Sequence, residues 1–406
     1  MEKILSNTKN SKKLEKVWKA SKKVGEEVAE NLIKLVKMRN KAARYLGFKN
    51  YFEMRLILSE QNPEEIETIY EELDLLTGRP YAELKYDMDD YFSEYYNIPV
   101  KDLRPWHYQN RFFQEAPNIY KIDFDKYYHK KDIVNLSEIF FESIKLEIDD
   151  IISNSDLFEE EGKTEMAFTR DINRNGDVRI LANIRDNSSS MRTMLYESAF
   201  AIYLKNIDKN LPYTLKEPAH FLINDAVAVL FSRMATSPSW LKNILNIDEK
   251  EINKISKECF KKLRLEKFVF SRFAQVMYHF EKDLYANPDR DLNKHWWDLV
   301  EKYQLIKRPD NRNLPDWASK IHLITQPCQY HNYMLGELLA SQFENYLRKN
   351  RIVKDKNFVG NTKVGEYFQN HIFRYGNFYQ WNELIERETG EKLSADHFKN
   401  QFIGMK

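Results

Sequence analysis

The sequence has few of the residues that β-rich or secreted proteins depend on. Its 406 residues include only 11 glycines, 12 prolines and 2 cysteines. So few turn-forming residues argue against an all-β chain, and helix is the expected structure. Cys259 and Cys328 form no C-x-x-C motif, so they predict a reducing compartment without excluding one disulfide.

An excess of one charge and long hydrophobic runs are also missing. Lysine and arginine number 63 against 62 aspartates and glutamates. This balance predicts no nucleic-acid partner and no membrane partner. Residues 1–16 lack the apolar core of a signal peptide, and no run of about 18 apolar residues could span a membrane. We therefore expect a cytoplasmic protein.

Helical periodicity dominates what is present. Apolar residues recur at three- and four-residue spacing between Lys13 and Leu46, and Gly47 should end that helix. One stretch departs from the pattern: residues 166–172 and 177–184, around Asn175-Gly176, predict two strands joined by a tight turn. With no repeat and no linker, we expect one elongated helical domain over 1–406. Further helices are expected at 63–78, 81–96, 136–152, 190–203, 219–237, 250–286, 332–349 and 380–388.

The stretch 194–203, MLYESAFAIY, is the most informative part of the chain. It reads as a helix in which a zinc peptidase would carry H-E-x-x-H, two imidazoles one turn apart with a glutamate beside them. In this chain the two histidine positions hold Tyr196 and Phe200. Glu197 is the one motif residue that is kept.

Four stretches around this helix carry a family resemblance. In order and spacing, the chain from Lys13 to Phe402 resembles the gluzincin metallopeptidases, in the branch of angiotensin-converting-enzyme-like, thimet-oligopeptidase-like and oligoendopeptidase-F-like enzymes. The resemblance implies a mainly helical, zincin-like peptidase fold with a small β-hairpin beside the cleft. The stretches are PWHYQNRFFQEAP (105–117), DINRNGDVRILANI (171–184), LKEPAHFLINDA (215–226) and QPCQYHNYMLG (326–336).

The same resemblance places the former zinc ligands at Tyr196, Phe200 and Asp225. A catalytic zinc site needs three protein ligands and an open position for water. Phenylalanine offers no ligand atom, neutral tyrosine is a poor ligand, and aspartate is one methylene shorter than the expected glutamate. We therefore expect zinc and zinc-dependent hydrolysis to be lost, with no other cofactor. A relocated metal site using His107 or His220 is the minor alternative.

Roles for residues beyond the metal position also follow from the resemblance. Glu197 matches the general base, and His322 with Tyr333 matches the pair that steadies the oxyanion, so these three are catalytic candidates, vestigial or repurposed. Lys320 and Tyr330 match the groups that hold the C-terminal carboxylate of a peptide. This chain has one extra residue between the histidine and the tyrosines.

Simpler interpretations stand beside these assignments. Glu197 could be a buried carboxylate satisfied by hydrogen bonds, and Lys320 could be a solvated surface residue. The strand 179–184, with Ala182 and Asn183 as substrate-binding candidates, could dock an extended peptide by strand addition or simply cover the helix. Cys328, in the expected cleft wall, is more typical of a small buried hydrophobe than of a nucleophile.

Two departures from the family pattern bear on partners and ions. The resemblance begins near Lys13, whereas the relatives carry a further N-terminal helical lid region. We therefore expect either a more open groove or a second chain that completes the cleft. Asn332 stands where relatives have an arginine used for chloride, so we expect no chloride dependence.

Together these observations predict a pseudopeptidase that binds a peptide or protein partner in the former substrate cleft without cleaving it. Two alternatives stay open. One is a metal-independent enzyme in which Glu197, Asp225, His322 and Tyr333 perform acid–base chemistry through separated pKa values. The other is a structural subunit of a complex.

Overall fold

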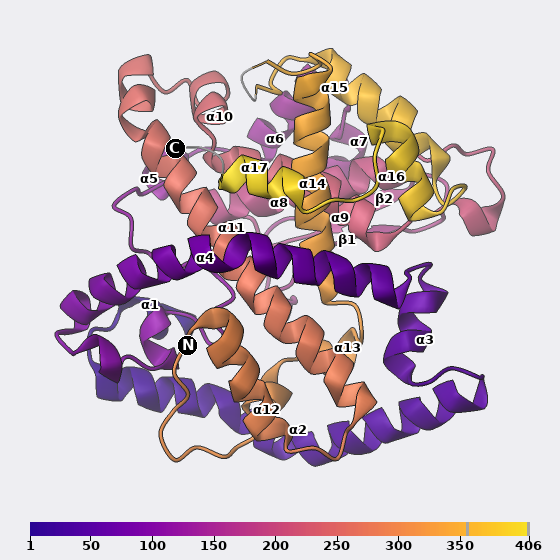
Figure 1. Cartoon of the computed structure of the whole chain (residues 1–406). Coiled ribbons are helices and arrows are strands. Elements are labelled where there is room, and N and C mark those ends of the chain that lie inside the picture. The colour runs from indigo at the N-terminus through magenta and orange to yellow at the C-terminus, as the bar shows by residue number, and fades with distance from the viewer. Residues whose placement is uncertain (355–356, 404–406) are drawn as a thin grey trace. The chain divides into compact units, whose positions relative to one another are not determined.

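The computed structural model describes residues 1–354 and 357–403, most of which are helical (Figure 1). Among these residues, one antiparallel hairpin supplies the regular strands. The predicted mainly helical fold with a small hairpin is confirmed. The described residues divide into two compact units, the first containing 1–121 and 264–334 and the second containing 122–263, 335–354 and 357–403. No helix of the described residues is long and apolar enough to cross a membrane.

The first unit is built on two long helices, α2 (Ser11–Tyr45) and α4 (Pro63–Tyr96). The side chain of Asn10 caps α2, and Asn62 caps α4 next to a proline whose missing N–H costs nothing at this position. The other elements wholly within this unit are α1 (Glu2–Asn7), α3 (Tyr51–Leu58), η1 (Val100–Asp102), η2 (Pro105–Tyr108), α12 (Leu292–Leu299), η5 (Val300–Gln304), η6 (Asp316–Ser319) and α13 (His322–Thr325).

Helix α4 corrects the predicted break at Gly78. The helix continues through Gly78 and Pro80 without interruption. Its buried face includes Leu73, Thr77 and Tyr81, which follow helical spacing across the glycine and the proline. Burial of this face therefore outweighs the cost of a proline inside a helix, which is about 3 kcal/mol.

Gly25 sets how closely α2 packs in the first unit. Helix α2 contacts η6, and a Cβ at Gly25 would overlap with the carbonyl oxygen of Pro315. The missing side chain lets the two backbones approach. Earlier on the same helix, Trp18 and Lys22 are buried, with exposed fractions of 1% and 2%.

The second unit surrounds α8 (Ser188–Lys205), which contains the central stretch 194–203. This helix is buried on most sides, as expected for a helix without a wide polar face. It packs against α9 (Phe221–Ser232) and against the hairpin of β1 (Phe168–Asp171) and β2 (Val178–Leu181). The side chain of Asn187 caps α8 by accepting from Ser190 N.

Two predicted helices of this unit are interrupted in the structure. The predicted helix 136–152 is α6 (Ile133–Ser143) followed by α7 (Asp149–Ser153). Lys145 has a left-handed φ of 61°, and Leu146 N donates to the carbonyl of Phe141, so the chain leaves α6 through a helix cap. The predicted helix 219–237 ends as α9 and continues as the 3-10 turn η4 (Arg233–Thr236).

The hairpin forms where the sequence predicted it, although its strands are shorter. Strand β1 pairs with β2 in antiparallel register, with Thr169 opposite Ile180. Gly176 takes the positive φ that the turn requires. The remaining elements wholly within this unit are α5 (Asp125–Tyr128), η3 (Tyr213–Leu215), α10 (Pro238–Asn243), α15 (Thr362–Tyr367), η7 (Phe368–Ile372), η8 (Phe373–Tyr375), α16 (Trp381–Thr389) and α17 (Asp396–Phe402). Helices α11 (Glu249–Ala286) and α14 (His331–Lys349) each contribute residues to both units.

Candidate functional site

Helix α8 presents Tyr196 and Phe200 one turn apart. Both side chains are half-buried, and their rings stack with centroids 6.4 Å apart and an angle of 27° between the planes. The i, i+4 spacing that would direct two imidazoles at one metal ion therefore brings two aromatic rings together.

Asp225, on α9, meets the first of these rings. The hydroxyl of Tyr196 donates to Asp225 Oδ1 at 2.5 Å. Gly336, on α14, packs on the same carboxylate so closely that a Cβ there would overlap with Asp225 Oδ2. The structure thus brings Tyr196, Phe200 and Asp225 into one cluster formed by α8 and α9 and closed by a glycine of α14.

The donor set of this cluster does not fit a catalytic zinc ion. Phe200 carries no ligand atom, and the hydroxyl of Tyr196 is engaged with the carboxylate of Asp225. Within residues 1–354 and 357–403, no group of three or more His, Cys, Asp or Glu side chains could hold a metal ion. A zinc site of this type needs three nitrogen, sulfur or oxygen ligands on protein side chains.

Glu197 is a buried carboxylate whose hydrogen bonds are provided by the hairpin. The hydroxyl of Thr169, on β1, donates to Glu197 Oε2 at 2.6 Å. Burial raises the pKa of Glu197, while the hydrogen bond from Thr169 and the charge of Arg170 act in the opposite direction. Thr169 was missed in the sequence, although it lies in the predicted strand 166–172.

Strand β2 has neighbours on both edges. Besides pairing with β1, it pairs with a short segment before the hairpin: Ala182 N donates to the carbonyl of Asp156 at 2.9 Å, and Ile184 N donates to that of Leu157 at 2.8 Å. Ala182 is also fully buried. Of the two alternatives for 179–184, strand addition therefore lacks a free edge at Ala182, and the hairpin that covers α8 agrees with the structure.

The outer strand of the hairpin is β1. The carbonyl of Ile180 and the N–H of Ala182 face the segment before the hairpin, so alternate residues of β2 face β1. By the same alternation, the N–H and C=O groups of Thr169 and Asp171 point away from β2.

Asn183, the second substrate-binding candidate of this stretch, has a structural contact. Its Nδ2 donates to the carbonyl of Thr164 at 2.8 Å.

The first unit contains the residues expected to hold a carboxylate. Lys320 is 4% exposed, and its Nζ lies 4.8 Å from the ring centroid of Tyr330, 4.9 Å from that of Phe273 and 5.3 Å from that of Phe112. Its ammonium donates to Gln114 Oε1. Burial lowers the pKa of Lys320 to about 7, with Glu115 raising it and Arg111 lowering it. Lys320 is therefore not a solvated surface residue.

His322 and the two tyrosines lie together beside this lysine. The ring of His322 contacts those of Tyr330 and Tyr333, with centroids 5.1 and 6.3 Å apart. The two tyrosine rings are 5.4 Å apart. Burial lowers the pKa of His322 to about 4, and the charge of Lys320 lowers it further. The imidazole is therefore neutral near neutral pH.

An irregular segment connects His322 to the two tyrosines. Helix α13 ends at Thr325 and α14 begins at His331, and Cys328 between them has a left-handed φ of 60°. Across this connection the rings of His322, Tyr330 and Tyr333 contact one another. Gln114 was missed as the partner of Lys320, although it lies in the family-like stretch 105–117.

The remaining histidine candidates have structural partners. His107 Nδ1 accepts from Arg104 N, and its Nε2 is hydrogen bonded to Ser11 Oγ, both at 2.9 Å. His220 caps α9 by accepting from Leu222 N at 3.0 Å. Burial lowers the pKa of each of these two histidines to about 4.

Both cysteines and Asn332 also lie in the interior. Cys259 and Cys328 are buried free thiols, and burial raises the pKa of both. The backbone N–H of Cys328 donates to Glu281 Oε1 at 2.7 Å. Asn332 Oδ1 accepts from Gln61 Nε2 at 2.7 Å. These contacts describe packed interior positions and give no site for a nucleophile.

Comparison with known proteins agrees with the resemblance seen in the sequence. A peptidase family model described as angiotensin-converting enzyme matches residues 1–404. An inactive angiotensin-converting enzyme-related protein of Caenorhabditis elegans is 27% identical over 130 residues. That match covers 30% of this chain and 14% of the relative, so it spans only a small part of the relative's length.

Proposed function

The chain belongs to the angiotensin-converting enzyme family, and from that premise we propose that it binds peptides or a protein partner without hydrolysing them. The residues expected to bind the ligand, Lys320 and Tyr330, match those that relatives use to hold their substrate. The residues expected to hold zinc are replaced. In this proposal the protein is a pseudopeptidase.

One observation carries the proposal: the hydrogen bond between Tyr196 and Asp225, with Phe200 stacked beside it. Tyr196 and Asp225, at two positions expected to supply metal ligands, are hydrogen bonded to each other. The third position, Phe200, carries a hydrocarbon ring that cannot be a ligand. Without a metal, the water that Glu197 would deprotonate has no reason to be acidic near neutral pH. The Caenorhabditis elegans relative is described as inactive, which points in the same direction.

Ligand recognition is proposed at Lys320. An ammonium beside an amide and a phenol recognises a carboxylate through charge-assisted hydrogen bonds. Gln114 Oε1 already accepts from this ammonium, and the ring of Tyr330 lies against it. We therefore propose that the ligand is a peptide, or a protein tail, with a free C-terminal carboxylate.

A metal-independent enzyme is less well supported than a binding protein. Acid–base chemistry needs a carboxylate that can reach substrate. Glu197 Oε2 accepts from Thr169, and Asp225 Oδ1 accepts from Tyr196. Both candidate carboxylates are therefore held by neighbouring side chains.

The experiment is a binding and cleavage assay on the same sample. Peptides with a free C-terminus and their amidated counterparts are titrated into the full chain, and the peptides are then analysed by mass spectrometry. We expect the free-carboxylate peptides to bind and to be recovered intact. Lys320→Met should abolish this binding, whereas Lys307→Met, at an exposed lysine of the same unit, should leave it unchanged. Equal binding of amidated peptides, or recovery of cleaved peptides, would contradict the proposal.

A further inference from the structure

Lys22 is a buried amine that lacks a polar partner. Its side chain lies on α2, and the residue is 2% exposed. Across residues 1–354 and 357–403, its Nζ makes no hydrogen bond and no ion pair. It lies instead 3.2 Å from the ring centroid of Phe112 and 5.2 Å from that of Trp18. A buried amine without an acceptor is costly unless it sheds its charge.

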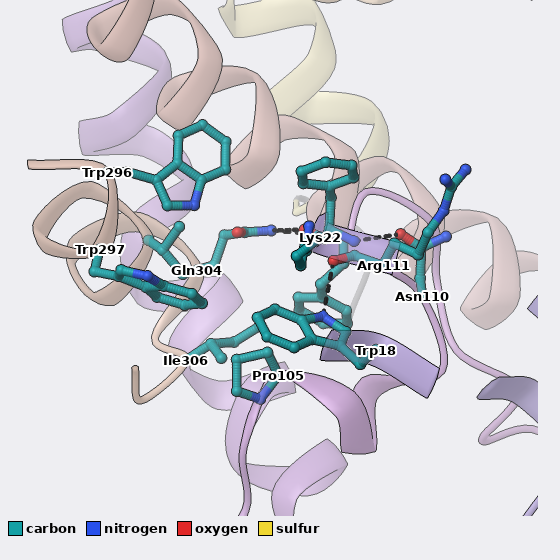
Figure 2. A pocket seen from close by; sticks show the side chains of 12 residues that line it. Trp18, Lys22, Pro105, Asn110, Arg111, Trp296, Trp297, Gln304 and Ile306 are labelled. Carbon is teal, nitrogen blue, oxygen red and sulfur yellow. Dashed lines mark hydrogen bonds between the residues drawn. The ribbon is translucent and has the colours of Figure 1, made fainter. Parts of the chain in front are cut away.

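The amine lines a small, partly enclosed cavity in the first unit (Figure 2). The cavity has a volume of about 20 Å³ and is walled by Trp18, Phe112, Trp296 and Trp297. This is space for about one or two small molecules of the size of water. The buried Nε1–H of Trp297 has no hydrogen-bond acceptor among the described residues. The lining therefore offers an amine and a spare donor.

Burial and three neighbouring cations favour a neutral amine at Lys22, and Asp316 opposes them. Burial lowers the pKa of Lys22 well below its usual value, and Asp316 raises it. The carboxylate of Asp316, however, accepts from Arg312 Nε and Nη2 at 2.7 to 3.0 Å. Arg111, Lys320 and Arg312 all lower the pKa of Lys22 further.

We propose that Lys22 is a carbamylation site, at which carbon dioxide adds to the side-chain amine. The nitrogen lone pair forms a bond to the carbon of carbon dioxide, one C=O π pair moves onto oxygen, and the nitrogen loses one proton to water. Nothing is oxidised or reduced, and the product is a carbamate with one negative charge. Carbon dioxide would enter the cavity that the amine lines, where the Nε1–H of Trp297 is a donor on the same lining.

A carbamylation site should react with carbon dioxide in preference to the exposed lysines of the same chain. Only an uncharged amine adds carbon dioxide, and an exposed lysine is uncharged in about one molecule in a thousand near pH 7.4. Lys23, the next residue on α2, is exposed. It provides a matched control with the same backbone and the same side-chain chemistry.

The experiment traps the carbamate on the full chain. The protein is equilibrated with ¹³C-labelled bicarbonate, treated with a trialkyloxonium salt to convert any carbamate to a stable ester, and mapped by peptide mass spectrometry. We expect the labelled ester on Lys22, at least about tenfold above that on Lys23. Lys23→Arg should keep the adduct, and Lys22→Arg should lose it.

Two results would overturn the proposal. The first is a folded wild-type protein that gives no ester at Lys22 in saturating bicarbonate. The second is an ester that forms equally on Lys22 and Lys23, because that outcome would show no special reactivity. The wild-type measurement needs no substitution, so it stands even when Lys22→Arg fails to fold. Neither result bears on peptide binding or on zinc.

Discussion

The hydroxyl of Tyr196 donates to Asp225 Oδ1 at 2.5 Å, from one central helix of the second unit to its neighbour. Asp225 is 1% exposed, so this hydrogen bond lies in the interior. In a zinc peptidase of this family we expect both positions to face a metal ion. In this chain the side chains of Tyr196 and Asp225 are hydrogen bonded to each other instead.

Restoring the histidines alone should not restore a peptidase. In the double variant Tyr196→His/Phe200→His, Asp225 remains one methylene shorter than the expected glutamate. We predict that zinc binding and peptide cleavage stay at background in the double variant and rise only when Asp225→Glu is added. Zinc content by elemental analysis and cleavage of an oligopeptide test this. An active double variant would show that the third position is less damaged than the account requires.

Packing at Asp225 makes Gly336 intolerant of a side chain. A Cβ at Gly336 would overlap with Asp225 Oδ2, and that carboxylate is held by Tyr196 and cannot easily move. We predict that Gly336→Ala lowers the free energy of unfolding by about 1–3 kcal/mol. Gly78→Ala is the control, since Gly78 also lies in a helix but its Cβ would have open space.

The control is expected to change stability in the opposite direction. Alanine is favoured over glycine inside a helix by about 0.5–1 kcal/mol, so Gly78→Ala should stabilise the protein. Denaturant titration monitored by circular dichroism measures both variants. A Gly336→Ala protein as stable as wild type would contradict the close packing at Asp225.

Glu281 should make stability depend on pH. The residue is 2% exposed, and burial raises its pKa from 4.5 to about 8, partly offset by the hydrogen bond from Cys328 N. Between these two values the folded state keeps a proton that the unfolded state has lost. The contribution of Glu281 is therefore complete below about pH 4.5 and is lost as pH rises towards 8.

Glu281→Gln should remove this dependence. We predict that the variant gains stability relative to wild type as pH rises from 5.5 to 8, on the order of 3 kcal/mol. Thermal unfolding at both pH values provides the measurement, and Glu71→Gln, at an exposed carboxylate, serves as control. A wild-type to variant difference that is constant with pH would refute the assignment.

Lys320 should make carboxylate binding depend on pH. Its pKa is lowered to about 7 by burial, so the free protein loses the ammonium above that pH. A peptide carboxylate binds the charged form, so affinity should fall above pH 7, by up to about tenfold per pH unit. Calorimetry at pH 6 and pH 8 with one free-carboxylate peptide tests the prediction. Affinity that rises with pH would exclude this ammonium as the recognition group.

The sequence was sufficient for features that depend on local pattern. The apolar spacing from Lys13 onwards predicted α2, and Asn175-Gly176 predicted the turn of the hairpin. Local signals failed where packing overrode them. Gly78 was predicted to end a helix, yet the buried face of α4 carries the helix through Gly78 and on through Pro80. Lys145 gives no sequence signal for the left-handed cap that divides α6 from α7.

The candidate site was predictable in its residues but not in their partners. The cluster of Tyr196, Phe200 and Asp225 follows from motif position. Gln114 is far from Lys320 in sequence, and its hydrogen bond to that lysine depends on how the first unit folds. The backbone partner of Ala182 was not predictable for the same reason. An alternating strand pattern does not reveal that a segment near Asp156 occupies the other edge of β2.

The most direct test of the central claim is the zinc content of the purified chain, measured together with oligopeptide cleavage before and after treatment with a chelator. We predict zinc well below one ion per chain, no cleavage, and peptide binding that the chelator leaves unchanged. One zinc ion per chain with cleavage that the chelator abolishes would contradict it.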